Sequence, residues 1–362
     1  MRLGPILMCA LKSLEISCLS MPPMPPMPPM ALKGESMSLL TTFKFIALTW
    51  LMSWSVGSFA QSSPMDYPAH PLKILVGYPA GGPVDTLARL YSPRLSQKMG
   101  QVVLVDNHAG ASGVIAADML AKAPPDGYQI LLAPVTLAII TGLKKHLPYD
   151  AQQDLVPLAW IANAPFVLVA SPALGIKSVP ELMARGHAVG RELNFASASV
   201  GGIPHLAGEI FNTMANIEMT HIPYKGAAPA TSDLLAGQVN LMFDSLISAL
   251  PYIKSNRLVA LGVTSKKRIA LAPDIPAISE FLPNYEAVGW YGFFVSKNTE
   301  IKTIAKLNAW INDVTQASEV EASLVKDGLE PVVADPATFK RFYLSEIAKW
   351  GKTVKQAKIT DE

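Results

Sequence analysis

Short runs of hydrophobic residues alternate with amphipathic stretches over most of the chain beyond residue 70. The run Lys73–Tyr78 predicts a buried strand, which the prolines and glycines of 79–83 break before a leucine-rich helix begins. Further strands are predicted at Val102–Asp106, Gln129–Ala133, Phe166–Ala170, Leu193–Ala196, Asn240–Asp244 and Leu258–Val263.

Helical patterns lie between these strands. Ile304, Leu307 and Ile311 recur at helical spacing, which places them on one helix face. Asp335 followed by Pro336 is typical of a helix start, with a capping carboxylate and a first-turn proline. This alternation predicts an α/β fold with parallel-rich sheets flanked by helices, and its extent favours two lobes.

The first 36 residues differ in composition from the rest. Met21–Met30 is a Met-Pro-Pro repeat, and repeated prolines disfavour helices and central strands. We expect translation to start at Met37, which makes 1–36 a low-complexity upstream segment outside the folded protein.

Residues 37–60 have the layout of a secretory signal peptide. Lys44 supplies a positive charge, an apolar core follows, and Ser58 and Ala60 place small residues before a cleavage point. The core is shorter than the ~18 residues of a membrane-spanning helix, so a retained anchor is the less favoured alternative. Cleavage after Ala60 leaves an exported chain of 302 residues.

Charge and cysteine content exclude several classes of protein. The chain has 30 basic and 28 acidic side chains, and this near balance argues against a polybasic nucleic-acid-binding protein. Cys9 and Cys18 both precede the signal peptide, so the exported chain has neither a disulfide scaffold nor a cysteine zinc site.

Three loops between predicted strands and helices share one chemistry. The first, Tyr78–Thr86, places Gly81 and Gly82 before Pro83, which makes Gly82 a helix N-cap without a side chain. The free N–H groups and the positive end of that helix suit a carboxylate or a phosphate. Asp85 has two interpretations, because it could satisfy the same donors or meet an ammonium group of a ligand.

The second and third loops repeat this arrangement. Ala196–His205 contains Gly201 and Gly202 and adds two serine hydroxyls, and Pro223–Pro229 offers an aromatic ring, a lysine cation and a glycine before a helix. In any one loop, glycine and proline more often serve only to end a strand and start a helix. Three repetitions favour anion binding, and the Walker and dinucleotide fingerprints are absent from the sequence.

Catalytic and metal-binding motifs are weak. The sequence lacks the GxSxG nucleophile motif. His205 and Glu209 are four residues apart, which is half of a helical metal motif, but no second helical histidine accompanies them. We therefore predict no enzymatic activity, no catalytic residue, no metal site and no cofactor.

Taken together, these residues resemble a known family. Tyr78–Arg89 resembles the signature loop of the Bug family, which comprises the extracytoplasmic solute receptors (substrate-binding receptors) of tripartite tricarboxylate transporters. Other similar segments follow in chain order: Val105–Asn107, Pro125–Tyr128, Leu147–Asp150, His205–Glu209, Pro223–Gly226, Asp233–Val239, Phe243–Asp244, Ala260–Ser265 and Ala348–Trp350.

The resemblance implies a two-lobed periplasmic binding protein whose chain crosses a hinge twice and which closes over a small carboxylate. Lobe 1 would comprise 61–163 and 284–362, and lobe 2 would comprise 164–283. The first loop would hold the carboxylate, and the other two would face it from lobe 2. The expected ligand-binding residues are Tyr78, Pro79, Ala80, Gly81, Gly82, Asp85, Thr86, Thr136, Ser197, Ala198, Ser199, Gly201, Gly202, His205, Tyr224, Lys225, Gly226 and Asp244.

The second loop departs from the family pattern. Positions that usually carry Asn, Thr and Ser hold Val200, Gly202 and Ile203. The loss of these side-chain donors predicts a monocarboxylate with an apolar or aromatic body over a tricarboxylate. The backbone N–H groups of Gly201 and Gly202 could still receive a second anion.

The leading hypothesis is a non-enzymatic periplasmic receptor that presents its ligand to membrane permease subunits or, alternatively, to a sensor kinase. We expect it to act as a monomer and to bind no nucleic acid. A secreted α/β hydrolase with His205 or Asp85 as base is a second hypothesis, against which the missing nucleophile motif counts. A structural or adhesion protein is the third.

Overall fold

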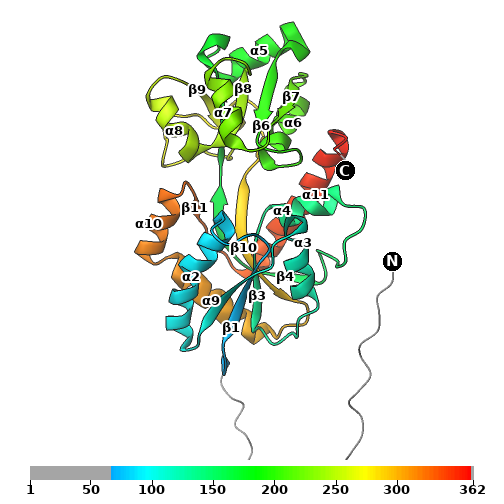
Figure 1. The fold of residues 1–362 in the computed structure, drawn as a ribbon, viewed down its shortest axis with the longest axis vertical. Helices are drawn as coiled ribbons and strands as arrows, with labels where there is room; N and C mark the ends of the chain where they lie inside the picture. Colours follow the sequence, from blue (N-terminus) through cyan, green and yellow to red (C-terminus); the bar gives the residue numbers. More distant parts are fainter. Residues whose placement is uncertain (1–66, 360–362) are drawn as a thin grey trace, which may run out of the picture. The chain divides into compact units, whose positions relative to one another are not determined.

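The computed structural model describes residues 67–359, which build two β-sheets flanked by helices (Figure 1). The upstream segment 1–36 and the signal peptide expected at 37–60 lie outside the described residues. Within 67–359, no helix combines the length and apolar character needed to cross a membrane.

Sheet A has six strands in the order β11-β4-β10-β3-β1-β2. β1 pairs in parallel with β2 and β3, whereas β10 pairs antiparallel with β3 and β4. The strands are β1 (Leu72–Val76), β2 (Val103–Asn107), β3 (Gln129–Pro134), β4 (Leu155–Ala164), β10 (Gly289–Ser296) and β11 (Glu330–Pro331).

Alternate residues of β1 face opposite helical layers, as the period of a strand requires. Ile74 and Val76 pack in one cluster with residues of α2, α9 and α10, whereas Leu75 packs in another with residues of α3, α4 and α11. The helices are α2 (Pro83–Met99), α3 (Val114–Ala121), α4 (Thr136–Leu143), α9 (Ile301–Thr315), α10 (Ser318–Lys326) and α11 (Pro336–Gln356).

Sheet B has five strands in the order β7-β6-β8-β5-β9. Leu168 and Phe243 face α5 and α6, and Val169 and Met242 face α7 and α8. The elements are β5 (Phe166–Ala170), β6 (Asn194–Ser197), β7 (Thr220–Pro223), β8 (Leu241–Ser245), β9 (Val259–Val263), α5 (Val179–Val189), α6 (Ile203–Ala215), α7 (Ala227–Leu235) and α8 (Leu246–Lys254), and four short 3-10 turns lie at Ala111–Gly113, Pro172–Leu174, Gly190–Glu192 and Ile278–Glu280.

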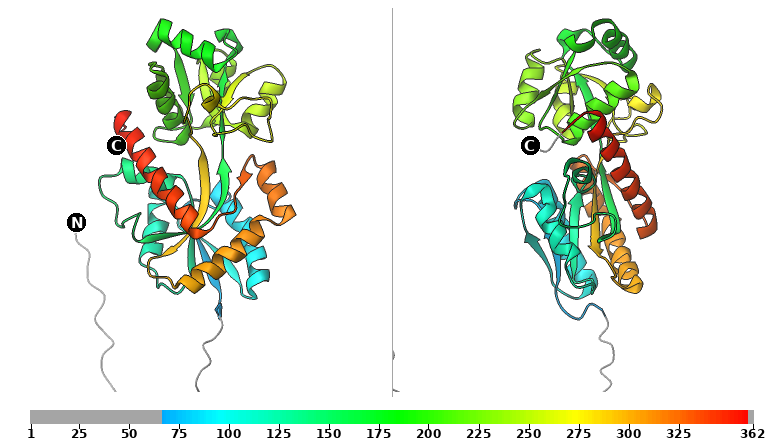
Figure 2. Two further views of the ribbon diagram at one scale, coloured as in Figure 1. Left: turned by 180° about the vertical axis from the view of Figure 1, so that it is seen from behind. Right: turned by 90° about the vertical axis from the view of Figure 1, so that its right-hand side faces the viewer.

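The chain crosses between the two sheets twice. β4 continues through Pro165 directly into β5, and the chain returns from β9 to β10 (Figures 1 and 2). These crossing strands pair antiparallel with their neighbours, so both sheets are mixed, where the sequence pattern predicted parallel-rich sheets. β1 pairs in parallel with β2 and β3, and β6 pairs in parallel with β7 and β8; the three glycine-rich loops follow β1, β6 and β7.

Each strand that the hydrophobic runs predicted is present, with its ends shifted by at most two residues. The pattern missed β4, β7, β10 and β11. β4 contains Pro157, which lies opposite Phe294 at an irregularity in the β4–β10 pairing, and β10 contains Gly292. Proline and glycine both disfavour strand interiors, which is why the two long strands of the crossing were not predicted.

The last helix is tied to the returning strand by a buried carboxylate. Glu346 of α11 is 3% exposed, and its Oε2 accepts hydrogen bonds from the indole N–H groups of Trp290 at 3.0 Å and Trp350 at 2.8 Å. The helix begins as predicted, because Asp335 accepts a hydrogen bond from the N–H of Thr338. α11 packs against β4, α4 and α6 (Figure 2). One continuous cluster of buried apolar residues includes members of both sheets.

Candidate functional site

The first glycine-rich loop leads from β1 into α2 and leaves backbone donors open. Gly81 has a left-handed φ of 81°, and Gly82 is the N-cap, with a φ of −77° and no side-chain hydrogen bond. Pro83 opens the helix without an N–H of its own. The N–H groups of Val84 and Asp85 have no partner among residues 67–359, so the positive end of a 17-residue helix is open to an anion.

Asp85 belongs to the internal framework of this loop. It is 1% exposed, and its Oδ2 accepts hydrogen bonds from Gly81 N and Arg89 Nε, both at 2.8 Å. Oδ1 accepts a third hydrogen bond from Asn107 Nδ2 at 3.0 Å. The Arg89 hydrogen bond is the main influence that lowers the pKa of Asp85 to about 2, against the opposing effect of burial. The carboxylate therefore holds the backbone of Gly81, and it does not satisfy the first-turn N–H groups that the first of its two interpretations assigned to it.

Tyr78 and Thr136 meet at the edge of sheet A that carries the first loop. The Tyr78 hydroxyl donates to the carbonyl of Ser112 at 3.2 Å and also bonds Thr136, the first residue of α4. Because β1 and β3 are parallel, their carboxyl ends lie at one edge, where ligands of open α/β sheets bind.

The second loop leads from β6 into α6. Of the two backbone N–H groups expected to face an anion, those of Gly201 and Gly202, the first is bound within the protein. Gly201 has a left-handed φ of 73°, and its N–H donates to Nδ1 of His205 at 3.0 Å. Gly202 is an N-cap without a side-chain hydrogen bond, and the N–H groups of Gly202 and Ile203 have no partner in the described part of the chain. Two backbone donors therefore remain open at the start of α6.

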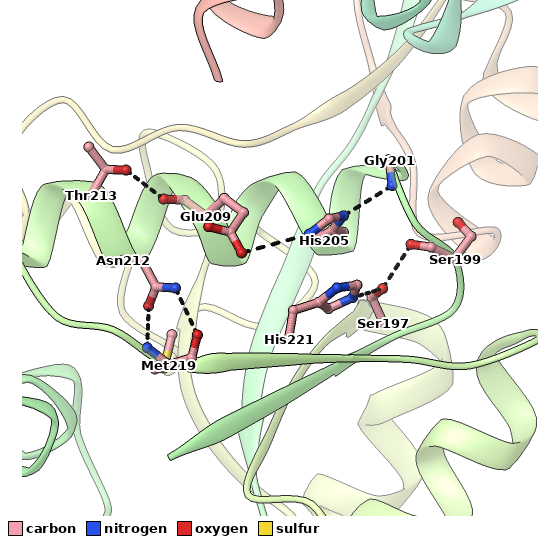
Figure 3. A network of polar contacts seen from close by, with 9 residues as sticks. All are labelled: Ser197, Ser199, Gly201, His205, Glu209, Asn212, Thr213, Met219 and His221. Atoms are coloured by element: carbon pink, nitrogen blue, oxygen red, sulfur yellow. Dashed lines mark hydrogen bonds and ion pairs between the residues drawn. The ribbon is translucent and has the colours of Figure 1, made fainter. Parts of the chain in front are cut away.

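Two histidines stack beside this loop. The ring centroids of His205 and His221 lie 3.6 Å apart with an interplanar angle of 11° (Figure 3). Ser197 is fully buried, and its hydroxyl bonds Nε2 of His221 at 2.7 Å and the carbonyl of Ser199 at 2.8 Å. Burial, and to a lesser degree His205, lowers the pKa of His221 to about 4.

The apolar side chains of the second loop lie in different environments. Val200 is 58% exposed, and its side chain is open to solvent. Ile203 reaches toward the returning strand, because a Cβ built on Gly289 would lie 3.1 Å from its Cδ1. Val200 is therefore the side chain of the two that offers free apolar surface.

The third loop lies against the second. The Tyr224 N–H donates to the carbonyl of Ser197 at 2.9 Å, and the Gly226 N–H donates to that of Ala198 at 3.0 Å. The Tyr224 hydroxyl donates to Asp233, and burial is the main cause that raises the pKa of this tyrosine to about 12. Lys225 is exposed, and Gly226 is the N-cap of α7.

Asp244 is a buried carboxylate with one oxygen left without a donor. It ends β8 at 5% exposure; its Oδ1 accepts from the N–H of Ser245 at 2.8 Å, while Oδ2 has no partner among residues 67–359. Burial raises the pKa of Asp244 to about 6. Its register partner is Val167, so both side chains share the sheet face that α7 and α8 cover.

A cavity of about 470 Å³ lies between the start of α2, the first crossing and the start of α8. Its lining is mainly apolar, with Thr86, Ser245 and Asp327 among the polar residues. The lining residues are Gly81, Pro83, Thr86, Leu87, Ala164, Pro165, Phe166, Ser245, Leu246, Ile247, Tyr291, Asp327, Gly328 and Leu329.

Of the expected site residues, Gly81 and Thr86 line this cavity. Tyr78 and Thr136 contact each other at the edge of sheet A. The residues of the second and third loops contact one another through the backbone hydrogen bonds of Tyr224 and Gly226. Sequence reasoning missed Phe166 and Tyr291, which lie on the crossing strands, and His221, which lies on β7. No local spacing connects His221 to His205, so only the packing of α6 against β6 and β7 could have placed them together.

Comparison with known proteins decides the family. The sequence model described as "Tripartite tricarboxylate transporter family receptor" (TctC) matches residues 87–359. The chain belongs to this family. The resemblance to the Bug family is thereby confirmed, and so is the prediction that the protein is not an enzyme, because the family comprises solute-binding receptors.

Two curated relatives align with the receptor over most of its length and most of their own. BugT of Bordetella pertussis is 34% identical over 316 residues, which cover 86% of this chain and 97% of BugT. A protein encoded in the tcbD-tcbE intergenic region of a Pseudomonas strain is 36% identical over 295 residues, which cover 81% of this chain and 88% of the relative.

Solved structures show the same periplasmic binding protein fold. An R. palustris protein solved with adipate is 32% identical, with a TM-score of 0.66 over 82% of this chain and 99% of that one. The periplasmic binding protein BugD is 28% identical, with a TM-score of 0.63 over 82% and 100%. MatC of Rhodopseudomonas palustris, solved with malate, is 27% identical, with a TM-score of 0.62 over 80% and 100%. The receptor is thus a periplasmic solute-binding protein of the TctC family.

Proposed function

We propose that this receptor captures a small carboxylate between two lobes, 61–163 with 284–362 and 164–283, and presents it to a membrane permease of the tripartite type. The observation that carries the proposal is the open start of α2, where the N–H groups of Val84 and Asp85 are free. This helix start borders a cavity of about 470 Å³ that contains Gly81 and Thr86. The relatives solved with adipate and malate both hold small carboxylates.

We infer further that the acid has one carboxylate at the first loop and an apolar body. The cavity presents Phe166, Leu246 and Ile247 to that body, and Val200 exposes apolar surface on the second loop. The N–H of Gly201 is occupied by His205, which reduces the donors for a second anion there. A carboxylate left with unmet hydrogen bonds costs about 1–3 kcal/mol per polar group.

Calorimetry with matched acids tests this ligand class. Hexanoate and adipate share a six-carbon chain and differ by one carboxylate, and citrate carries three. We expect hexanoate and adipate to bind more tightly than citrate. Tightest binding of citrate, with no affinity for hexanoate, would contradict the apolar-body proposal and leave the receptor function intact.

The role of the first loop is tested by Gly82→Val, with Gly351→Val as the matched control. Neither glycine has a positive φ; a Cβ on Gly82 would lie 3.2 Å from the carbonyl of Pro79, and a Cβ on Gly351 would meet nothing within 4 Å. We expect Gly82→Val to weaken binding of the preferred acid at least tenfold with only a small drop in melting temperature. Equal affinity in both variants would show that the loop is only structural.

Export depends on the segment that precedes the described residues. We propose that translation starts at Met37 and that cleavage follows Ala60, on the sequence layout of 37–60. N-terminal sequencing of the periplasmic protein should start at Gln61. Retention of the Met-Pro-Pro run in the exported protein would disprove this.

A sensor kinase is the alternative partner to a permease. A permease partner and a kinase partner are distinguished by measuring uptake of the preferred acid in cells that lack the receptor. Lost uptake supports the permease, whereas unchanged uptake with lost induction of a response to the acid supports the kinase.

A further inference from the structure

The stacked pair His205 and His221 lies beside the second loop, to which His205 is joined by the hydrogen bond from the Gly201 N–H. His205 is 6% exposed, and His221 is partly buried on β7. Phe195 of β6 packs beside both rings, with ring centroids 6.4 Å from His205 and 5.1 Å from His221. The two rings therefore contact the second loop from its protein side, through Gly201 and Ser197 (Figure 3).

The hydrogen bonds define where the proton of His205 lies. The N–H of Gly201 can only donate, so Nδ1 of His205 must be the bare, accepting nitrogen. The ring proton is then on Nε2, which faces Oε1 of Glu209 at 3.7 Å. His205 is consequently the neutral Nε2–H tautomer in this arrangement.

The same reasoning fixes His221. The Ser197 hydroxyl has one proton, and it donates this proton to the carbonyl of Ser199 at 2.8 Å. The contact of 2.7 Å between the Ser197 oxygen and Nε2 of His221 must then have the histidine as donor. Both rings thus carry a proton on Nε2. His205 is neutral because its Nδ1 is bare, and burial, which lowers the pKa of His221 to about 4, keeps that ring neutral as well.

We propose that this neutral imidazole stack is the positioning element of the second loop: His205 holds Gly201 in its left-handed conformation, and His221 supports His205 and Ser197. The proposal rests on the receptor function proposed above, because the conformation it holds leaves the N–H groups of Gly202 and Ile203 open for an anionic ligand.

Protonation of His205 is incompatible with this arrangement. A second proton would have to go on Nδ1, where it would face the N–H of Gly201 and abolish the hydrogen bond. Among the groups that face the pair, Glu209 on α6 is titratable, whereas Ser197 and Phe195 on β6 are not. Burial of His221 lowers the pKa of that ring and opposes a charge on it.

The conformation of Gly201 also matters to the contact between the two sheets. A Cβ on Gly201 would lie 3.3 Å from Cδ1 of Leu143, at the end of α4 on the sheet A side. The second loop therefore meets the other part of the chain at the residue that His205 holds. Loss of the hydrogen bond to His205 should therefore make the positions of the Gly202 and Ile203 N–H groups less fixed. It should also weaken the contact between Gly201 and Leu143.

Three variants separate the components of the stack. His205→Phe keeps the ring and removes the acceptor, His205→Asn keeps an acceptor near the position of Nδ1 and removes the stack, and His221→Phe keeps the stack and removes the donor to Ser197. In the unliganded protein we expect the Gly201 amide to exchange its hydrogen at least tenfold faster in His205→Phe than in the wild type. His205→Asn should restore most of the protection.

Two further measurements complete the test. Nitrogen-15 NMR of the wild-type imidazoles at pH 7.5 should show both histidines as Nε2–H tautomers, and His205→Phe should weaken adipate binding at least tenfold with a melting temperature close to that of the wild type. An Nδ1–H tautomer of His205, or unchanged Gly201 exchange in His205→Phe, would overturn the proposal. If the exchange and tautomer results hold but wild-type protein does not bind adipate, the positioning role stands and adipate as a ligand of the proposed function fails.

Discussion

At the scale of single residues, two aspartates near the ends of parallel strands show how neighbours decide the state of a carboxylate. Asp85 has three donors and a lowered pKa of about 2, whereas Asp244 has one donor, an unmatched oxygen and a raised pKa of about 6. Both are at least 95% buried. Burial alone therefore does not set the pKa, because hydrogen bonds to the charged form can outweigh it.

Asp85→Asn should lower stability near neutral pH by about 1–3 kcal/mol, since it removes the negative charge that faces Arg89 and leaves one acceptor oxygen for three donors. The folded pKa lies below the ordinary value of 3.8, so this contribution is complete above about pH 4 and is lost as the pH falls toward about 2. Thermal denaturation between pH 2 and pH 7 measures it. Asp313→Asn, which breaks an exposed ion pair with Lys98, should change stability by less than about 0.5 kcal/mol.

A ligand contact of Asp85 would give a different result. In that case the variant should lose mainly amino acids from a binding screen, because the carboxylate would meet an ammonium group. Unchanged stability together with selective loss of amino acids would refute the framework role.

Asp244→Asn should raise stability at pH 7.5 by about 1–3 kcal/mol, since it removes the cost of a buried charge. The folded pKa of about 6 lies above the ordinary 3.8, so wild-type stability falls as the pH rises from about 4 to about 6. The gain in the variant should therefore vanish near pH 4 in thermal denaturation experiments. A variant less stable than the wild type at pH 7.5 would show that Oδ2 is matched by a donor in solution.

At the scale of elements, the glycine-rich loops depend on how closely their helices approach the sheets. α6 lies so close to β6 that a Cβ on Gly208 would be 2.2 Å from the ring of Phe195. That ring also packs beside the histidine stack. The position of the second loop is therefore coupled to the packing of the helix that follows it.

Gly208→Ala should lower the free energy of unfolding by about 1–3 kcal/mol through overpacking of this contact. Gly351→Ala is the control, because it lies inside α11 with nothing within 4 Å of the added Cβ, and alanine favours helix there by up to about 1 kcal/mol. Chemical denaturation measures both. Equal effects of the two substitutions would mean that α6 moves away from β6 at no cost.

At the scale of the whole molecule, the two sheets are joined by strands rather than by helical connections. β4 passes through Pro165 into β5, and β10 returns along β4, so the cavity lies beside the crossing itself. Phe166 and Tyr291, both on crossing strands, line the cavity. A ligand there would contact both parts of the chain and the connection between them.

The preferred acid at about 100 times its dissociation constant should raise the free energy of unfolding by about 2.7 kcal/mol. If capture closes the two lobes, small-angle X-ray scattering should show a smaller radius of gyration with the acid than without it. Gly82→Val should show neither change at the same concentration. A stabilised protein with an unchanged radius would contradict closure while retaining binding.

The sequence by itself determined most strands, the glycine-and-proline helix starts and the family, because hydrophobic periodicity, cap residues and a signature loop are local properties. Gly82 is the N-cap that its place before Pro83 predicted, and Gly202 and Gly226 cap the helices that follow the other two loops. Asp335 is a side-chain cap for the same reason, since the bond spans only three residues.

Only the tertiary structure decided which of these local features meet. The stack of His205 on His221 depends on the packing of α6 against β6 and β7, and the partners of Asp85 include Asn107 at the end of β2. β4 and β10 were missed because their proline and glycines conflict with local strand preference, which the pairing between the two strands overrides. Contacts between distant segments depend on strand register and helix packing, and neither is encoded in the spacing of residues along one segment.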